Sequence, residues 1–303
     1  MRKVFFIPFA YDNAMKTGVN VSQKDPKNIY LKNLCVALIS AKRTTPDIDV
    51  ALVCNMSICD PYKEALEKND IRIIIEPFDD FIFSSDYKWG LAFYKLCALK
   101  KMVERHEYDY YVFADADVIV QESLAHIYDE LDDHILLYDI NLGLQTEEYR
   151  IFLEEIKSFW GDCRITHYGG EFFGASHNNA VLFVEHCQSV YRKMIQENFK
   201  TTKGDEFITS IVADEIKDKI KNAGAYIFRY WTGDFYLVST CYRYNKVAIL
   251  HMPSEKRTIA RIFDKYVLKG KFPSQEKIYR MCHLFKPRVK QRIKRTLKKL
   301  HIL

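Results

Sequence analysis

An apolar stretch interrupted by two carboxylates constrains the fold of this chain more than any other feature. Residues 110–120 read Tyr-Tyr-Val-Phe-Ala-Asp-Ala-Asp-Val-Ile-Val, so aromatic and branched residues flank Asp115 and Asp117 on both sides. Such runs are typical of strands inside a sheet. Residues two apart in an extended chain point to the same side, so the two carboxylates can converge. Because unpaired buried carboxylates are costly, we expect both at the exposed end of the strand, beside a cation.

Two carboxylates in this position indicate a site for a metal ion and a diphosphate. Hard cations such as Mg²⁺ and Mn²⁺ bind carboxylate oxygens and share the rest of their shell with water and phosphates. Asp-x-Asp also occurs by chance in many acidic loops, so the motif alone does not decide. An apolar strand followed by Asp-x-Asp-x-Val also resembles the nucleophile motif of haloacid-dehalogenase-type phosphatases.

The first 120 residues alternate between strand and helix patterns. Strands are predicted at 3–9, 49–54 and 72–76, and helices from Pro26 onward, at 61–69 and at 89–106. Further strands are predicted at 135–139, 225–229 and 247–250, and helices at 146–159, after Ser176 and after Gly204. This alternation predicts an α/β domain with a mixed, mainly parallel central sheet over residues 1–270, followed by a tail, 271–303.

Three further stretches carry candidate site residues. Phe9, Ala10 and Tyr11 follow the first strand, where nucleotide-binding α/β folds meet the base; the two aromatic rings can stack on a base or belong to the core. Residues 166–176 interleave three glycines with aromatics, which favours backbone that passes close to a ligand or turns sharply. Asp205 and Glu206 precede an apolar helix, and simple stabilisation of a helix start is the alternative to a role in the site.

The C-terminal tail holds much of the basic charge. Residues 283–303 contain eight basic residues and no acidic one, and without them the 45 basic residues fall to 37 against 40 acidic, a net charge of −3. That balance argues against a general nucleic-acid binder. Val289, Ile293, Leu297 and Leu300 lie on one face of a predicted basic amphipathic helix. Such a helix is typical of binding to anionic membrane surfaces, with a solvated or self-packed tail as the alternative.

The sequence also predicts a cytoplasmic protein at the inner face of the cell membrane. The apolar run 4–7 is too short for a signal peptide, and no segment approaches the ~20 apolar residues of a spanning helix. The eight cysteines are scattered without a Cys-x-x-Cys pair, which is typical of reduced, buried cysteines.

Three landmarks follow one another in a recognisable order: Asp115-Ala116-Asp117, the glycine-rich stretch 169–174, and Gly204-Asp205-Glu206. Together they resemble the GT-A glycosyltransferases, and more narrowly the family of the histo-blood-group A and B transferases and the α-1,3-galactosyltransferases. Steps of 54 residues from Asp115 to Gly169 and 37 from Gly169 to Glu206 are close to those of that family. The resemblance covers about residues 85–260. Gly204 replaces a histidine and Glu171 an apolar residue of the family, so donor and acceptor choice do not carry over.

The resemblance implies a single GT-A (Rossmann-like) domain and a role for each matched residue. Asp115 and Asp117 would hold Mn²⁺, or Mg²⁺, against the donor diphosphate, and Glu206 would face the anomeric carbon as the catalytic carboxylate. His251 resembles the metal-binding histidine of the lipooligosaccharide galactosyltransferase and glycogenin family, although an isolated histidine is more often structural. The donor-binding residues would be Phe9, Ala10, Tyr11, Lys95, Ala116, Asp205, Lys256 and Arg257, and the sugar- or acceptor-binding residues Gly169, Gly170, Glu171 and Trp231.

The expected function is metal-dependent transfer of a hexose from a UDP-sugar to a glycan or lipid-linked glycan, in bacterial surface polysaccharide synthesis. The hexose would be galactose, glucose or an N-acetyl relative, transferred with retention of anomeric configuration. An inverting enzyme would use Glu206 as a base, and a non-catalytic sugar-nucleotide-binding protein is a third alternative. The phosphatase is disfavoured because its nucleophile normally lies on the first strand, whereas about a hundred residues of α/β pattern precede Asp115 here.

Overall fold

The computed structural model describes residues 1–12, 25–84, 87–141, 143–230 and 247–284, together with residues 293, 296, 297 and 300. Its central sheet has seven strands in the order β3-β2-β1-β4-β7-β6-β8. Their bounds are β1 (Lys3–Phe9), β2 (Asp49–Cys54), β3 (Arg72–Ile75), β4 (Tyr110–Ala114), β6 (Ile135–Asp139), β7 (Tyr168–Ser176) and β8 (Ile220–Asn222). Strands β3, β2, β1 and β4 run parallel, β7 is antiparallel to β4 and β6, and β8 is parallel to β6. The predicted mixed, mainly parallel α/β sheet is confirmed.

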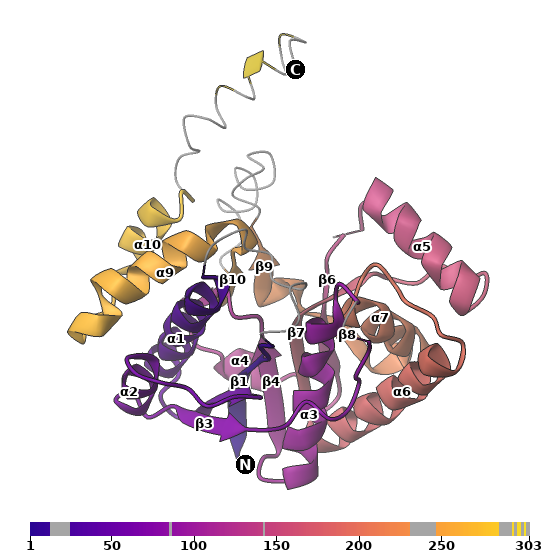
Figure 1. The fold of residues 1–303 in the computed structure, drawn as a ribbon, viewed down its shortest axis with the longest axis horizontal. Helices are drawn as coiled ribbons and strands as arrows, with labels where there is room; N and C mark the ends of the chain where they lie inside the picture. Colours follow the sequence, from indigo (N-terminus) through magenta and orange to yellow (C-terminus); the bar gives the residue numbers. More distant parts are fainter. Residues whose placement is uncertain are drawn as a thin grey trace.

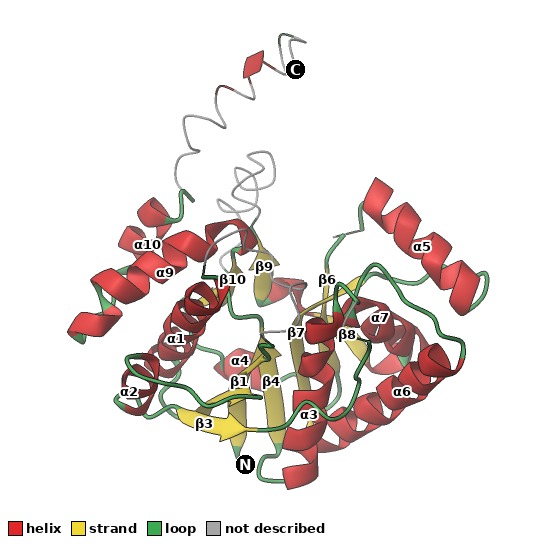
Figure 2. Cartoon of the chain, viewed as in Figure 1, coloured by secondary structure: helices red, strands yellow, loops and turns green. Residues whose placement is uncertain are grey.

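Helices cover both faces of this sheet (Figures 1 and 2). The bounds of the described helices are α1 (Pro26–Thr44), α2 (Tyr62–Glu67), α3 (Tyr94–Arg105), α4 (Ala125–Tyr128), α5 (Glu147–Phe159), α6 (His177–Gln196), α7 (Asp205–Glu215), α9 (Lys256–Lys265) and α10 (Gln275–Met281). Strand β1 shows why the sheet needs both layers. Its Phe5 and Ile7 pack in the apolar cluster of α1, α2 and α9, whereas Val4 and Phe6 pack in that of α3, α6 and α7. Alternate side chains of a central strand point to opposite faces, so an apolar strand must be covered twice.

A second, smaller sheet joins segments that are far apart in the chain. Strand β10 (Ile249–His251) pairs antiparallel with β5 (Val118–Val120) and parallel with β9 (Ile227–Arg229). In this register His251 lies opposite Val118 on one side and Arg229 on the other. Because Val118 directly follows Asp117, this pairing brings a distant histidine beside the two aspartates.

Several local predictions differ from the structure. The glycine-rich stretch is an extended strand, β7, so the sharp turn, one of the two alternatives for its glycines, is absent there, and its pairing with β6 is irregular between Leu137 and Tyr138. The helix predicted at 89–106 begins as a 3₁₀ turn, Gly90–Phe93, before α3. Strand β8 was not predicted, because Ile-Lys-Asn is too short and polar to show a strand pattern.

The chain beyond residue 270 begins with a packed helix. Ile278 of α10 and the following Cys282 are buried in the same cluster as α1 and α9. The tail beyond residue 284 lies almost wholly outside the described residues, so its amphipathic helix stays a prediction. Within the described ranges, none of the helices has the length and apolar character needed to cross a membrane.

Candidate functional site

A cavity of about 420 Å³ opens where β1 and β4 end. Parallel strands of an α/β sheet place ligands beyond their carboxyl ends. The predicted residues Phe9, Ala10, Tyr11, Lys95, Asp115, Ala116, Asp117, Asp205, Glu206, His251 and Lys256 all line this cavity. The structure therefore brings together residues from five separate parts of the chain.

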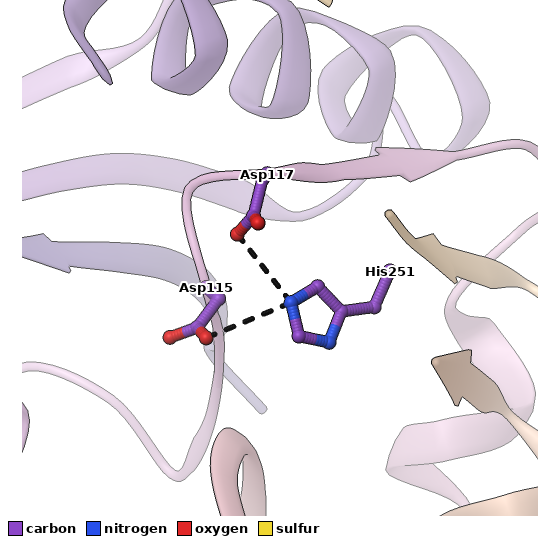
Figure 3. A group of neighbouring side chains, drawn as sticks. All are labelled: Asp115, Asp117 and His251. Atoms are coloured by element: carbon purple, nitrogen blue, oxygen red, sulfur yellow. Dashed lines mark ion pairs between the residues drawn. The ribbon is translucent and has the colours of Figure 1, made fainter. Parts of the chain in front are cut away.

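The two aspartates and His251 form a cluster that can hold a metal ion (Figure 3). Asp115 follows β4, Asp117 precedes β5, and His251 ends β10. One ligand atom from each residue lies within 4.8 Å of the others, and His251 Nε2 is 3.7 Å from Asp115 Oδ2 and 3.4 Å from Asp117 Oδ1. Carboxylate oxygens with one imidazole suit a divalent cation such as Mn²⁺. The donor set therefore fits the predicted cation.

Charged neighbours keep the cluster ionised. Lys256 Nζ lies 2.5 Å from Asp117 Oδ2. Burial opposes the charge on Asp117, but Lys256 and His251 outweigh it and hold the pKa of this carboxyl well below its usual value. Burial likewise opposes a charge on His251, but Asp117 and Glu171 raise the pKa of the imidazole to about 9. Without a bound cation, positive side chains therefore balance the two aspartates.

Lys95 connects the cluster to helix α7. Its Nζ lies 3.3 Å from Asp115 Oδ1 and 3.0 Å from Asp205 Oδ2. Burial raises the pKa of Asp205 to about 7, with Lys95 opposing the shift. A Cβ atom on Gly170 would lie only 1.9 Å from Asp205 Oδ2 and 2.7 Å from Lys95 Nζ. Gly170 is therefore required by the close approach of these side chains to β7.

Glu206 lies in the first turn of α7 and is held by two partners. Its Oε2 is 3.1 Å from His167 Nε2, and its Oε1 is 3.4 Å from Arg229 Nη2. His167 is itself fixed by stacking on Phe152, with ring centroids 4.0 Å apart. Burial alone would raise the pKa of Glu206, but His167 and Arg229 lower it. Glu206 is thus an oriented, ionised carboxylate on the cavity wall.

Neither a protein-family model nor a curated protein sequence matches this chain. Its structure is similar to that of the galactosyltransferase LgtC in complex with donor and acceptor sugar analogues. That match has a TM-score of 0.55 at 15% identity and covers 92% of this chain and 99% of the other. This chain has the GT-A fold. Mouse xyloside xylosyltransferase 1, in its apo form, is also similar, with a TM-score of 0.49 at 13% identity, covering 82% of this chain and 96% of the other.

The predicted GT-A fold and the resemblance to the lipooligosaccharide galactosyltransferase are thereby confirmed at the level of the fold. The sequence identity of 15% is too low to carry over a reaction. Glu171 departs from its expected place. It was expected to face a sugar, but its side chain is wholly buried, and among the described residues it does not line the cavity. Both of its oxygens instead lie 2.6 Å from nitrogens of Arg229.

The remaining residues that were expected to bind the sugar, the acceptor or the donor lie in three kinds of place. Gly169 and Gly170 belong to β7, where a Cβ on Gly169 would lie 1.7 Å from Glu171 Oε2. Arg257 is exposed on α9, outside the described lining of the cavity. Trp231 lies outside the described residues.

Sequence reasoning missed His167 and Arg229, the two partners of Glu206. Both line the GT-A cavity. His167 immediately precedes the glycine-rich strand, and Arg229 ends a short strand, but one polar residue beside an apolar run has no specific pattern. The only available signal was their place at strand ends, where sites of α/β folds gather.

Proposed function

We propose that this chain is a glycosyltransferase that uses a divalent cation to move a hexose from a UDP-sugar to a glycan or lipid-linked glycan. The observation that carries the proposal is the convergence of Asp115, Asp117 and His251 with Glu206 in one cavity of the GT-A fold. The cavity of about 420 Å³ is within the usual size range of small-molecule sites, roughly 300–1,000 Å³. Galactose, glucose and their N-acetyl relatives are the proposed sugars.

The loop after β1 is the proposed site of the nucleotide base. The backbone N–H of Tyr11 donates to Asn55 Oδ1 at 3.0 Å, and the Asn55 amide donates back to the Tyr11 carbonyl at 3.3 Å. These bonds fix the loop at the cavity edge. Phe9 is mostly buried and lies against Tyr30, with ring centroids 5.9 Å apart. Tyr11 is therefore the ring that we assign to the base, while Phe9 supports the wall.

Charge on the departing diphosphate is the main obstacle in cleaving a sugar–phosphate bond. A divalent cation held by Asp115, Asp117 and His251 would supply positive charge at the diphosphate. Lys256 and Lys95, which line the same cavity, would add to that charge and orient the donor. Mn²⁺ is the cation that we propose, with Mg²⁺ as the second choice.

Glu206 is the proposed catalytic carboxylate. As the bond breaks, the sugar becomes cation-like, and an ionised carboxylate on its opposite face can stabilise or trap it. His167 and Arg229 lower the pKa of Glu206, which favours this ionised role. A general base works best with a pKa near the operating pH, so the same shift supports retention over an inverting reaction.

We further propose that the basic tail binds an anionic membrane surface during the synthesis of a bacterial surface polysaccharide. The support is the sequence of residues 283–303, with eight basic residues and no acidic one. Sedimentation with vesicles that contain an anionic phospholipid checks this part. The full chain should sediment, whereas a chain that ends at residue 284 should stay in solution.

Calorimetric titration with UDP, with and without Mn²⁺, tests the donor site. We expect binding that requires Mn²⁺ and is lost in Asp117→Asn. Asp70→Asn is the matched control, because Asp70 is an exposed partner of Lys42 outside the described lining of the cavity. Absence of UDP binding under either condition would refute the UDP-sugar assignment. Turnover of UDP-sugars then separates an enzyme from a non-catalytic binder, and the anomeric configuration of the product separates retention from inversion.

A further inference from the structure

Glu171 contacts both the cation cluster and the partner of Glu206 from behind the cavity. It lies on β7, and its neighbours Arg229 and His251 end the adjacent strands β9 and β10. Glu171 Oε1 is 2.6 Å from Arg229 Nε, and Oε2 is 2.6 Å from Arg229 Nη2. The same Oε1 is 3.4 Å from His251 Nδ1. One wholly buried carboxylate thus lies between two functional side chains.

The contact with His251 gains importance when a cation binds. An imidazole that binds a cation through Nε2 must carry its proton on Nδ1. His251 Nδ1 is buried and has no hydrogen-bond partner among the residues that the structure describes. A buried N–H without an acceptor is costly, and Glu171 Oε1 needs to approach by only a few tenths of an ångström to accept this proton. Glu171 is therefore suited to fix the orientation and tautomer of His251.

The contact with Arg229 extends the same effect to Glu206. Two parallel N–H···O bonds from one guanidinium to one carboxylate give a strongly directional pair. This pair holds Arg229 Nη2 at 3.4 Å from Glu206 Oε1. Without Glu171, the guanidinium would lose both of these bonds, and its contact with Glu206 would lose that support. The position of Arg229 beside Glu206 therefore depends on Glu171.

We propose that Glu171 is a positioning residue that orients His251 for cation binding and Arg229 for its contact with Glu206. A single buried carboxylate then couples the cation site to the reaction centre. The part that concerns Glu206 rests on the proposed function, whereas the part that concerns His251 requires only cation binding. A purely structural Glu171 would neutralise Arg229 without any effect on the cation.

Glu171→Gln tests the proposal, because it keeps the size of the side chain and removes its charge. Mn²⁺ affinity is measured without nucleotide, from the electron paramagnetic resonance signal of free Mn²⁺. We expect a loss of about 10–100-fold in affinity, the usual effect of removing an outer partner of a metal ligand. At saturating Mn²⁺, kcat should remain low because Arg229 is no longer held. Glu130→Gln is the matched control, since Glu130 accepts from Lys221 and Tyr226 outside the described lining of the cavity.

Glu171→Gln removes the carboxylate that forms two bonds with the buried Arg229, and this variant can fail to fold. The charge-balanced double variant Glu171→Gln/Arg229→Gln removes both charges and should still lose Mn²⁺ affinity. Wild-type Mn²⁺ affinity in either folded variant would overturn the proposal. Proton and nitrogen-15 NMR of histidine-labelled wild-type protein with Mg²⁺ and UDP needs no variant: a strongly downfield Nδ1–H resonance of His251, as for an N–H that donates to a carboxylate, supports the proposal, and an Nδ1–H at the shift of an unbonded imidazole overturns it.

The outcomes separate this proposal from the proposed function. Wild-type protein that binds Mn²⁺ but consumes no UDP-sugar refutes the glycosyltransferase, while the Mn²⁺ affinities of the variants still decide the role of Glu171 toward His251. If the wild-type protein consumes UDP-sugar and Glu171→Gln binds Mn²⁺ as tightly as the wild type, only the proposal for Glu171 is refuted. Wild-type protein that binds no Mn²⁺ refutes both.

Discussion

The ammonium group of Lys256 lies 2.5 Å from the carboxylate of Asp117, the more deeply buried of the two paired aspartates. Lys256 therefore provides positive charge at the carboxylate that would bind the cation. In the proposed reaction the same ammonium group contacts the diphosphate of the donor. The ammonium group should therefore weaken the binding of the cation alone and strengthen the binding of the nucleotide.

Replacing Lys256 with methionine should separate the two roles. Without the competing ammonium group, Mn²⁺ alone should bind severalfold more tightly to Lys256→Met. UDP should bind about tenfold more weakly in the presence of Mn²⁺, because a loss of about 1.4 kcal/mol in charge attraction is tenfold in affinity. Paramagnetic resonance measures the first quantity and calorimetry the second. Lys265→Met, at the far end of α9, is the control; weaker Mn²⁺ binding in Lys256→Met would show that Lys256 supports the cation site.

Gly170→Ala should impair donor binding more than folding. The new Cβ would lie 1.9 Å from Asp205 Oδ2 and 2.7 Å from Lys95 Nζ, so the two side chains must separate or turn away from β7. We expect KM for the donor to rise, or kcat to fall, by at least about tenfold, since misplaced contacts cost severalfold to hundredfold in rate. Steady-state kinetics and thermal unfolding measure the two effects.

Gly174→Ala is the matched control on the same strand. Its Cβ would meet Leu131 Cδ2 at 3.2 Å and Leu136 Cβ at 3.6 Å, two apolar side chains outside the described lining of the cavity. This variant should lose some stability and keep wild-type donor kinetics. Equal kinetic losses in both variants would mean that β7 tolerates no added methyl group, and that Gly170 has no special relation to the site.

His167→Phe should lower turnover without disrupting the core. Phenylalanine keeps the stacking on Phe152 but removes the Nε2 contact with Glu206 at 3.1 Å. Glu206 would then lose one of the two partners that lower its pKa. We expect kcat to fall about 10–100-fold with little change in UDP affinity, on the scale of removing one oriented polar partner at a reaction centre. Unchanged kcat would exclude a role for His167 at Glu206.

Alkaline pH should unfold the protein through its buried tyrosines. Burial raises the pKa values of Tyr62, Tyr108 and Tyr111 to about 12. The pKa of Tyr110 is also raised to about 12, mainly because its hydroxyl donates a hydrogen bond to the Asp132 carboxylate. Because these values exceed the unfolded value of about 10, their stabilising contribution is complete below pH 10 and is lost between pH 10 and 12. Phenolate absorbance should therefore rise together with the loss of circular dichroism. Phenolate formation in a protein that stays folded would contradict this expectation.

The elements near the centre of the sheet were predictable because their signals are local. The apolar run of β4 indicates a strand wherever it lies, and the place of Asp115 and Asp117 after its end follows from the same run. The alternation of strands and helices before residue 120 likewise predicted a mainly parallel sheet, whereas the order of its strands came from the structure. Short elements such as β8 were missed because three residues show too little periodicity to distinguish a strand from a loop.

The sequence alone thus determined the α/β class, the paired aspartates at the end of β4 and the two acids that begin α7. Tertiary structure alone decided which other side chains surround these residues in the site. His251 reaches the aspartates only because β10 pairs with β5, and Glu171 pairs with Arg229 because β9, held beside β10, brings the guanidinium to within 2.6 Å of that carboxylate. Strand periodicity gives the side to which a residue points, but its partners depend on the register between strands that are distant in the chain, and no local pattern encodes that register.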